Sequence, residues 1–246
     1  MRMRYLVLGL AIAACAPPAP PAPAQETATP AAAGYARDGL TFPKPDRPVA
    51  TIVGPHTRDE ADRDTDNEGV KLMDAAGART GMTVADIGAG AGYMTSYLSR
   101  RVGPEGRVLA QDVMSAHLIL LRTRIEREGL KNVTVSMGGY DDARLAPASA
   151  DLAMLVRMYH EIDQPYGLMW RLRASLKPGG RVAINDVDRP TRDHGTPPKL
   201  LRCELAAVGY REVSWTELGP EIGYVAVFEP VGPAPDPASI KPCKAR

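Results

Sequence analysis

The sequence has few aromatic residues and almost no net charge. Two Phe, two Trp and nine Tyr make up 5% of its 246 residues, and acids and bases balance to a net charge of +1. Proteins that bind nucleic acid usually present a basic surface, and single-strand binders add aromatic side chains on which bases stack. Both shortages argue against nucleic acid as the partner.

The chain also lacks an apolar run long enough to span a bilayer. Arg2 and Arg4 precede a short apolar stretch over residues 5–14, which is typical of a signal peptide rather than of a transmembrane helix. Ile12-Ala13-Ala14-Cys15 resembles the lipobox of bacterial lipoproteins. The resemblance implies a signal peptide over residues 1–15, a lipidated Cys15 on a membrane surface, and a location in the cell envelope or periplasm. Secretory cleavage near residues 22–24, or a cytoplasmic protein that starts later, are the alternatives.

Cysteine and histidine are scarce. The four His and three Cys form no cluster in the sequence, so we expect no metal site. If Cys15 is lipidated, Cys203 and Cys243 remain, and in an oxidising compartment they could form a disulfide. Cys203 lies on the apolar face of an expected helix, which favours a buried thiol instead.

Composition divides the rest of the chain into three parts. Residues 16–56 form a spacer and lead-in that is rich in Pro and Ala near its start, a composition typical of extended, semi-rigid segments. Residues 57–230 contain the periodic apolar patterns of a folded domain. Residues 231–246 contain repeated Pro, and we expect a disordered tail.

Strands and helices alternate along the domain, which predicts an α/β fold with a doubly wound, mostly parallel sheet and a ligand at the carboxyl ends of the strands. A closing pair of strands predicts a terminal antiparallel β-hairpin. We expect strands at 84–87, 107–112, 132–137, 151–156, 181–186, 212–215 and 224–228, and helices within 59–76 and at 93–102, 115–128, 164–176 and 197–208.

The most informative stretch reads V-A-D-I-G-A-G-A-G-Y over residues 84–93. An apolar strand ends near Asp86, where we expect the chain to meet solvent. Gly88, Gly90 and Gly92 then allow a sharp turn and a close approach of a ligand to the backbone. The helix that follows offers its free N–H groups at the same point.

The next expected strand identifies the type of ligand. It ends in Asp112, 20 residues after Gly92, the spacing of a carboxylate that binds ribose hydroxyls. This arrangement suits a dinucleotide or S-adenosylmethionine. The spacing G-A-G-A-G after an Asp resembles motif I of the class I S-adenosylmethionine-dependent methyltransferases, whereas dinucleotide-binding folds more often show G-x-G-x-x-G.

A narrower resemblance covers more of the domain. R-D-E-A-D-R-D at residues 58–64, the Gly-Tyr step at 92–93 and V-G-P-E-G-R-V at 102–108 resemble a group of bacterial predicted methyltransferases with an exported leader. The resemblance implies a Rossmann-like fold and S-adenosylmethionine as cofactor, without identifying the methyl acceptor.

The family's cofactor roles can be carried over by position. The resemblance implies that Asp86 contacts the amino group of the cofactor's methionine and that Gly88, Gly90 and Gly92 pass beneath its ribose and methionine. Asp112 would accept both ribose hydroxyls. Asp142 and Ala143 resemble the acid–small pair that meets the adenine amino group, with Asp141 as the alternative if the alignment shifts by one residue.

Methyl transfer needs an acid or base only if the acceptor must lose a proton; otherwise alignment suffices. His160 and Glu161 follow the fourth strand, so His160 is the candidate base and Glu161 its orienting partner. Asp186 ends the fifth strand and is a further catalytic candidate, and His194 lies in a loop that could contact the substrate. The alternative for each is a cap or a loop hydrogen bond.

Two functions follow from these observations. The first is an S-adenosylmethionine-dependent methyltransferase that acts on a small molecule. The second is a lipid-anchored binding module of the cell envelope on the same scaffold, without turnover, because S-adenosylmethionine is made in the cytoplasm. The intact set of Asp86, Asp112 and the three glycines favours the enzyme.

Overall fold

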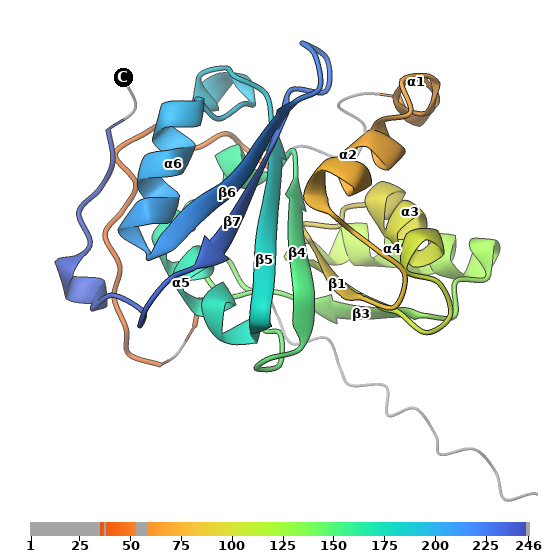
Figure 1. Cartoon of the computed structure of the whole chain (residues 1–246), viewed down its shortest axis with the longest axis horizontal. Helices are drawn as coiled ribbons and strands as arrows, with labels where there is room; N and C mark the ends of the chain where they lie inside the picture. Colours follow the sequence, from red (N-terminus) through yellow and green to blue (C-terminus); the bar gives the residue numbers. More distant parts are fainter. Residues whose placement is uncertain (1–34, 37, 53–58, 245–246) are drawn as a thin grey trace, which may run out of the picture.

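The computed structural model describes residues 35–36, 38–52 and 59–244, which build a single seven-stranded sheet in the order β3-β2-β1-β4-β5-β7-β6 (Figure 1). Strands β1 to β5 run parallel to their neighbours, whereas β7 is antiparallel to both β5 and β6. The expected doubly wound sheet with a closing antiparallel hairpin is confirmed.

The observed elements start and end close to the expected residues. The strands are β1 (Thr83–Ile87), β2 (Arg107–Asp112), β3 (Val133–Met137), β4 (Ala150–Val156), β5 (Leu176–Asp186), β6 (Tyr210–Glu217) and β7 (Tyr224–Pro230). The α-helices are α1 (Glu60–Thr65), α2 (Glu68–Ala76), α3 (Tyr93–Val102), α4 (Ser115–Glu128), α5 (Pro165–Ser175) and α6 (Pro198–Ala207), and the short 3-10 helices are η1 (Tyr159–Glu161), η2 (Thr191–Asp193) and η3 (Pro237–Ser239). Strand β5 starts before residue 181 because Leu176 already pairs with β4 across a register shift.

Helices cover both faces of the sheet (Figure 1). Helices α2, α3 and α4 bury Leu72, Leu98 and Leu121 against one face, and α5 and α6 bury side chains such as Leu172 and Leu205 against the other. Each such side chain contributes about 1.5–3 kcal/mol when it leaves water. This packing fixes the parallel strands so that their carboxyl ends lie along one edge, where α/β folds bind ligands.

The folded unit begins well before the expected boundary at residue 57. Arg47 is buried and pairs with buried Glu204 on α6 at 3.0 Å, and it also donates to the carbonyl of Tyr159. The backbone N–H of Ala50 donates to the carbonyl of His160. A buried charge without such partners costs several kcal/mol, so this lead-in segment belongs to the core. It runs along the α6 side of the molecule, drawn in orange in Figure 1.

The expectation of a disordered tail is wrong for residues 231–244. Ile240 and Cys243 are buried, Asp46 and Lys244 form an isolated β-bridge, and Cys203 on α6 forms a disulfide with Cys243. The two cysteines therefore pair, and Cys203 is not the buried thiol that its helix face favoured. Repeated Pro prevents regular helix and strand here but leaves side chains free to pack.

The expected leader and most of the spacer, with Cys15, lie outside the described residues. Within the described ranges, no helix combines the length and apolar character needed to cross a membrane.

Candidate active site

A cavity of about 350 Å³ opens at the carboxyl edge of the parallel strands. The turns after β1, β2 and β4 line it, together with residues from the lead-in and from α1. Of the residues singled out in the sequence, the cavity lining includes Asp86, Gly88, Gly90, Asp112 and Glu161. The structure therefore brings these five residues together around one cavity.

Gly88 and Gly92 of the first turn have different structural roles. Gly88 has φ of 69°, and a Cβ there would lie 3.0 Å from Met158, which forms part of the cavity wall. Gly92 has φ of 90°, and a Cβ there would lie 2.6 Å from Leu121 on α4. Gly92 is not among the described residues that line the cavity, so it serves helix packing rather than ligand contact.

Asp86 does not meet bulk solvent as expected. Its side chain is buried, lines the cavity and accepts a 2.6 Å hydrogen bond from the Thr95 hydroxyl on α3. Burial raises the pKa of Asp86 to about 6; the negative charge of Asp112 adds to this, while the Thr95 hydroxyl and the charge of Arg63 oppose it. A carboxylate that is buried and incompletely compensated is suited to bind a cation from the ligand.

Asp112 is held more firmly. Oδ2 accepts from the Gly90 backbone N–H at 2.9 Å, and Oδ1 accepts from the Met114 N–H at 2.8 Å and lies 3.2 Å from Nδ1 of His117. These bonds tie the glycine turn to the end of β2 and point the carboxylate into the cavity. His117 and Gln111 also line the cavity, and no motif in the sequence had marked either of them.

The expected adenine contacts are not where the alignment placed them. Asp142 and Ala143 are not among the described residues that line the cavity; Asp142 accepts from the Arg144 N–H and Ala143 lies in the core. The alternative, Asp141, forms a 2.9 Å ion pair with Arg171 on α5. The lining at this point comes instead from residues 139 and 140, just before the expected pair.

Charged residues of α1 border the mouth of the cavity. The guanidinium of Arg63 lies 3.6 Å from the centre of the Tyr93 ring and 2.9 Å from Glu68. Arg63, Tyr93 and Glu60 all line the cavity. The acid-rich start of this helix was interpreted only as favourable for the helix dipole, so its place at the site was missed.

On the other side of the cavity, the expected catalytic residues divide into two layers. Glu161 lines the cavity, whereas His160 is only 2% exposed and is not among the described lining residues. Nδ1 of His160 lies 2.9 Å from Oδ2 of Asp186, which also accepts from the Thr196 hydroxyl. Asp186 is fully buried and does not face the crevice as expected. Asp186, rather than Glu161, therefore orients the imidazole of His160.

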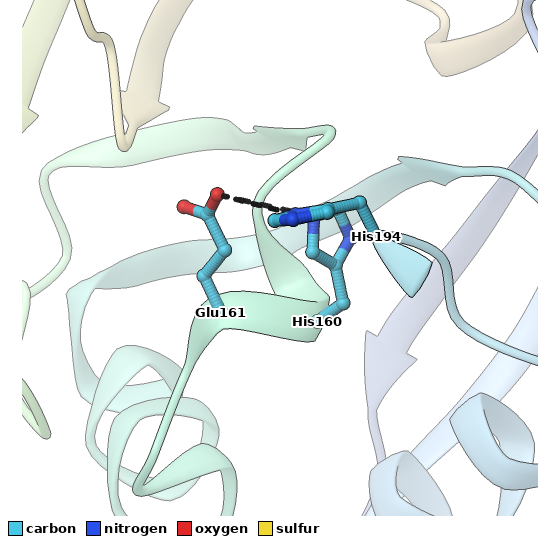
Figure 2. A group of neighbouring side chains, drawn as sticks. All are labelled: His160, Glu161 and His194. Atoms are coloured by element: carbon cyan, nitrogen blue, oxygen red, sulfur yellow. Dashed lines mark ion pairs between the residues drawn. The ribbon is translucent and has the colours of Figure 1, made fainter. Parts of the chain in front are cut away.

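His194 approaches this group from the loop after η2. Its Nδ1 lies 4.0 Å from Oε1 of Glu161, and its ring meets that of His160 edge-on with centroids 5.3 Å apart (Figure 2). The sequence shows no cluster of His and Cys, but the fold brings three candidate ligands together: His160, Glu161 and His194 place one ligand atom each within 4.8 Å of one another. Residues 34 positions apart in the sequence meet only through the fold.

Comparison with known proteins shows similarity to methyltransferases. Residues 84–180 match the family model described as a methyltransferase domain. A solved S-adenosylmethionine-dependent methyltransferase from Aquifex aeolicus superimposes with a TM-score of 0.62 at 24% sequence identity, covering 70% of this chain and 98% of that one. These matches support the resemblance to class I S-adenosylmethionine-dependent methyltransferases, and they imply S-adenosylmethionine as the cofactor.

The curated relatives match only part of the chain. A ubiquinone/menaquinone biosynthesis C-methyltransferase, UbiE, from Idiomarina loihiensis is 33% identical over 120 residues, 48% of this chain and 47% of the relative. An arsenite methyltransferase from Halobacterium salinarum is 30% identical over 110 residues, 44% of this chain and 27% of that relative. The chain therefore spans less than half the length of these two relatives.

Replacing Asp112 with Ala should weaken S-adenosylmethionine binding. The change removes a charged acceptor for two ribose hydroxyls, and losing such a bond costs about 1.5–3 kcal/mol, roughly tenfold to a hundredfold in affinity. Isothermal titration calorimetry measures the effect, and Asp142→Ala is the matched control because it lies outside the cavity lining. Unchanged binding by Asp112→Ala would show that the ribose lies elsewhere.

Cofactor affinity should fall as pH drops through about 6, because protonation of Asp86 removes the negative charge available to the cofactor's ammonium group. If cofactor binding requires ionised Asp86, affinity changes by about tenfold per pH unit below its pKa. Titrations from pH 5 to 8 on wild type and Asp86→Asn check this, and an equal slope in both proteins would contradict it.

The raised pKa of Asp86 also affects the stability of the fold. Without cofactor, protonation of Asp86 stabilises the folded state as pH falls from 6 toward 4.

Proposed function

We propose that this chain is a methyltransferase that moves the methyl group of S-adenosylmethionine to a small-molecule acceptor. The observation that carries the proposal is the pairing of Asp86 and Asp112 at the ends of adjacent parallel strands, around one glycine turn and inside one cavity. The first carboxylate suits the amino group of the cofactor and the second its ribose hydroxyls.

The acceptor belongs beside the segment that follows β4, where Met158 and Ile162 supply apolar surface and Glu161 supplies a carboxylate. Methyl transfer from a sulfonium depends on in-line alignment and on excluding water, which such a wall can provide. Next to Glu161, the buried His160 is held by its hydrogen bond with Asp186.

The names of the relatives point to different acceptors. One is a C-methyltransferase of ubiquinone and menaquinone biosynthesis, and another is an arsenite methyltransferase. Since the two relatives are named for different acceptors and match less than half of this chain, we carry over the cofactor and leave the acceptor open.

Methyl transfer can be tested directly. The purified protein should bind S-adenosylmethionine by calorimetry and pass a labelled methyl group to a low-molecular-weight component of a cell extract, and Asp112→Ala should lower both signals. Absence of binding would contradict the proposal. Binding without any transfer would instead favour the envelope binding module without turnover.

We also propose that the chain works outside the cytoplasm, anchored to a membrane surface through Cys15. The Cys203–Cys243 disulfide supports this, because structural disulfides persist mainly in oxidising compartments. Mass spectrometry of the native protein should detect a lipidated N-terminal Cys15 and the oxidised pair, and Cys15→Ser should block lipidation. An unprocessed Met1 with two free thiols would contradict this location.

A further inference from the structure

Two imidazoles and one carboxylate converge beside the cavity. His160 and Glu161 come from η1, and His194 comes from the loop after η2 (Figure 2). Nε2 of His160 and Nδ1 of His194 each lie 4.0 Å from the same atom, Oε1 of Glu161. A general base requires only one imidazole, whereas here two imidazole nitrogens lie close to the same carboxylate oxygen.

The spacing of these atoms is close to that of a metal site. A triangle with two sides of 4.0 Å and a third no longer than 4.8 Å has a circumradius of at most about 2.5 Å. Metal–ligand bonds from His nitrogen and Glu oxygen to zinc measure about 2.0–2.2 Å. A shift of about half an ångström per side chain would therefore complete three bonds.

The surroundings of His160 fit the same interpretation. Ligand histidines commonly donate their other ring N–H to a carboxylate, which fixes the tautomer and raises the basicity of the ligand nitrogen. Asp186 accepts at this position: its Oδ2 lies 2.9 Å from Nδ1 of His160, and the Val187 N–H and the Thr196 hydroxyl hold the carboxylate. His160 is thereby fixed with Nε2 facing Glu161.

His194 shows an unsatisfied atom in the same place. Its Nδ1 is buried and has no hydrogen-bond partner among the described residues, although the side chain as a whole is 38% exposed. Its backbone has φ of 57°, a left-handed conformation that is uncommon outside glycine and concentrates at functional sites. The loop therefore holds this ring nitrogen 4.0 Å from Oε1 of Glu161, with no hydrogen bond to any residue that the structure describes.

We infer that His160, Glu161 and His194 bind a divalent transition metal, with Zn²⁺ the best match. Two imidazoles and one carboxylate are a ligand set of zinc enzymes that leaves one position open, whereas Mg²⁺ and Ca²⁺ prefer oxygen ligands throughout. Because Glu161 also lines the cavity, the metal lies at its acceptor wall. That placement relative to an acceptor rests on the proposed function; metal binding itself does not.

The test is metal binding to the full chain in the absence of S-adenosylmethionine. Chelator-stripped wild type should bind one Zn²⁺ by calorimetry and by elemental analysis, and the metal should raise its thermal midpoint because it binds the folded state. His194→Ala and Glu161→Gln each remove a ligand and should lower affinity by more than about 100-fold. Asp186→Asn should lower it by about 10–100-fold, the usual effect of losing an outer partner.

His117→Ala is the matched control: it removes a histidine that lies beside Asp112, outside the triad, so Zn²⁺ binding should stay at the wild-type level. Thermal unfolding of the metal-free variants reports whether each of them folds. If His194→Ala does not fold, Glu161→Gln is used to test the site instead. The inference is overturned if wild type takes up no Zn²⁺, or if folded His194→Ala or Glu161→Gln binds it as wild type does. Calorimetry with S-adenosylmethionine on the stripped protein is a separate readout, so failure of the metal site and failure of the methyltransferase proposal are distinguishable.

Discussion

A buried carboxylate is costly unless hydrogen bonds or cations compensate its charge, and the site depends on how three of them are compensated. Asp112 and Asp186 are the last residues of β2 and β5, Asp86 is the last but one of β1, and all three are buried. Ending parallel strands in acids places negative charge along the edge where the ligand must lie. The fold is stable with these acids because backbone N–H groups, hydroxyls and imidazoles of the following turns meet them.

The degree of compensation separates the roles of the three acids. Asp112 and Asp186 each accept from a backbone N–H and contact an imidazole, so each has a structural partner and is held in a fixed position. Asp86 accepts a hydrogen bond from the Thr95 hydroxyl, but this does not fully compensate its buried charge, and its pKa is therefore raised. A bound ammonium group would supply the missing positive charge. The least compensated acid is therefore the one that cofactor binding stabilises most.

Local patterns sufficed for the sheet and for the two acids, Asp86 and Asp112, that meet at the cavity. A strand that ends in an acid, followed by alternating glycines and a helix, can be recognised over about ten residues, and Asp112 follows at a fixed spacing. The Pro-rich segments at both ends could not be interpreted this way, since their order comes from long-range contacts: Arg47 with Glu204, and Cys243 with Cys203. Composition predicts which regular elements a segment lacks, but it does not show what the segment packs against.

The sequence named His160, Glu161, Asp186 and His194 as candidates but did not show how they are arranged, for the same physical reason. The buried guanidinium of Arg47 binds the carbonyls of Tyr159 and Ile162 on either side of His160, and the Ala50 N–H binds the carbonyl of His160 itself. The lead-in thus fixes the backbone that carries both His160 and Glu161, while the loop after η2 brings His194 to the same place. A group of side chains assembled by tertiary contacts has no periodicity or spacing, so the acceptor wall can differ while the cofactor motif stays the same.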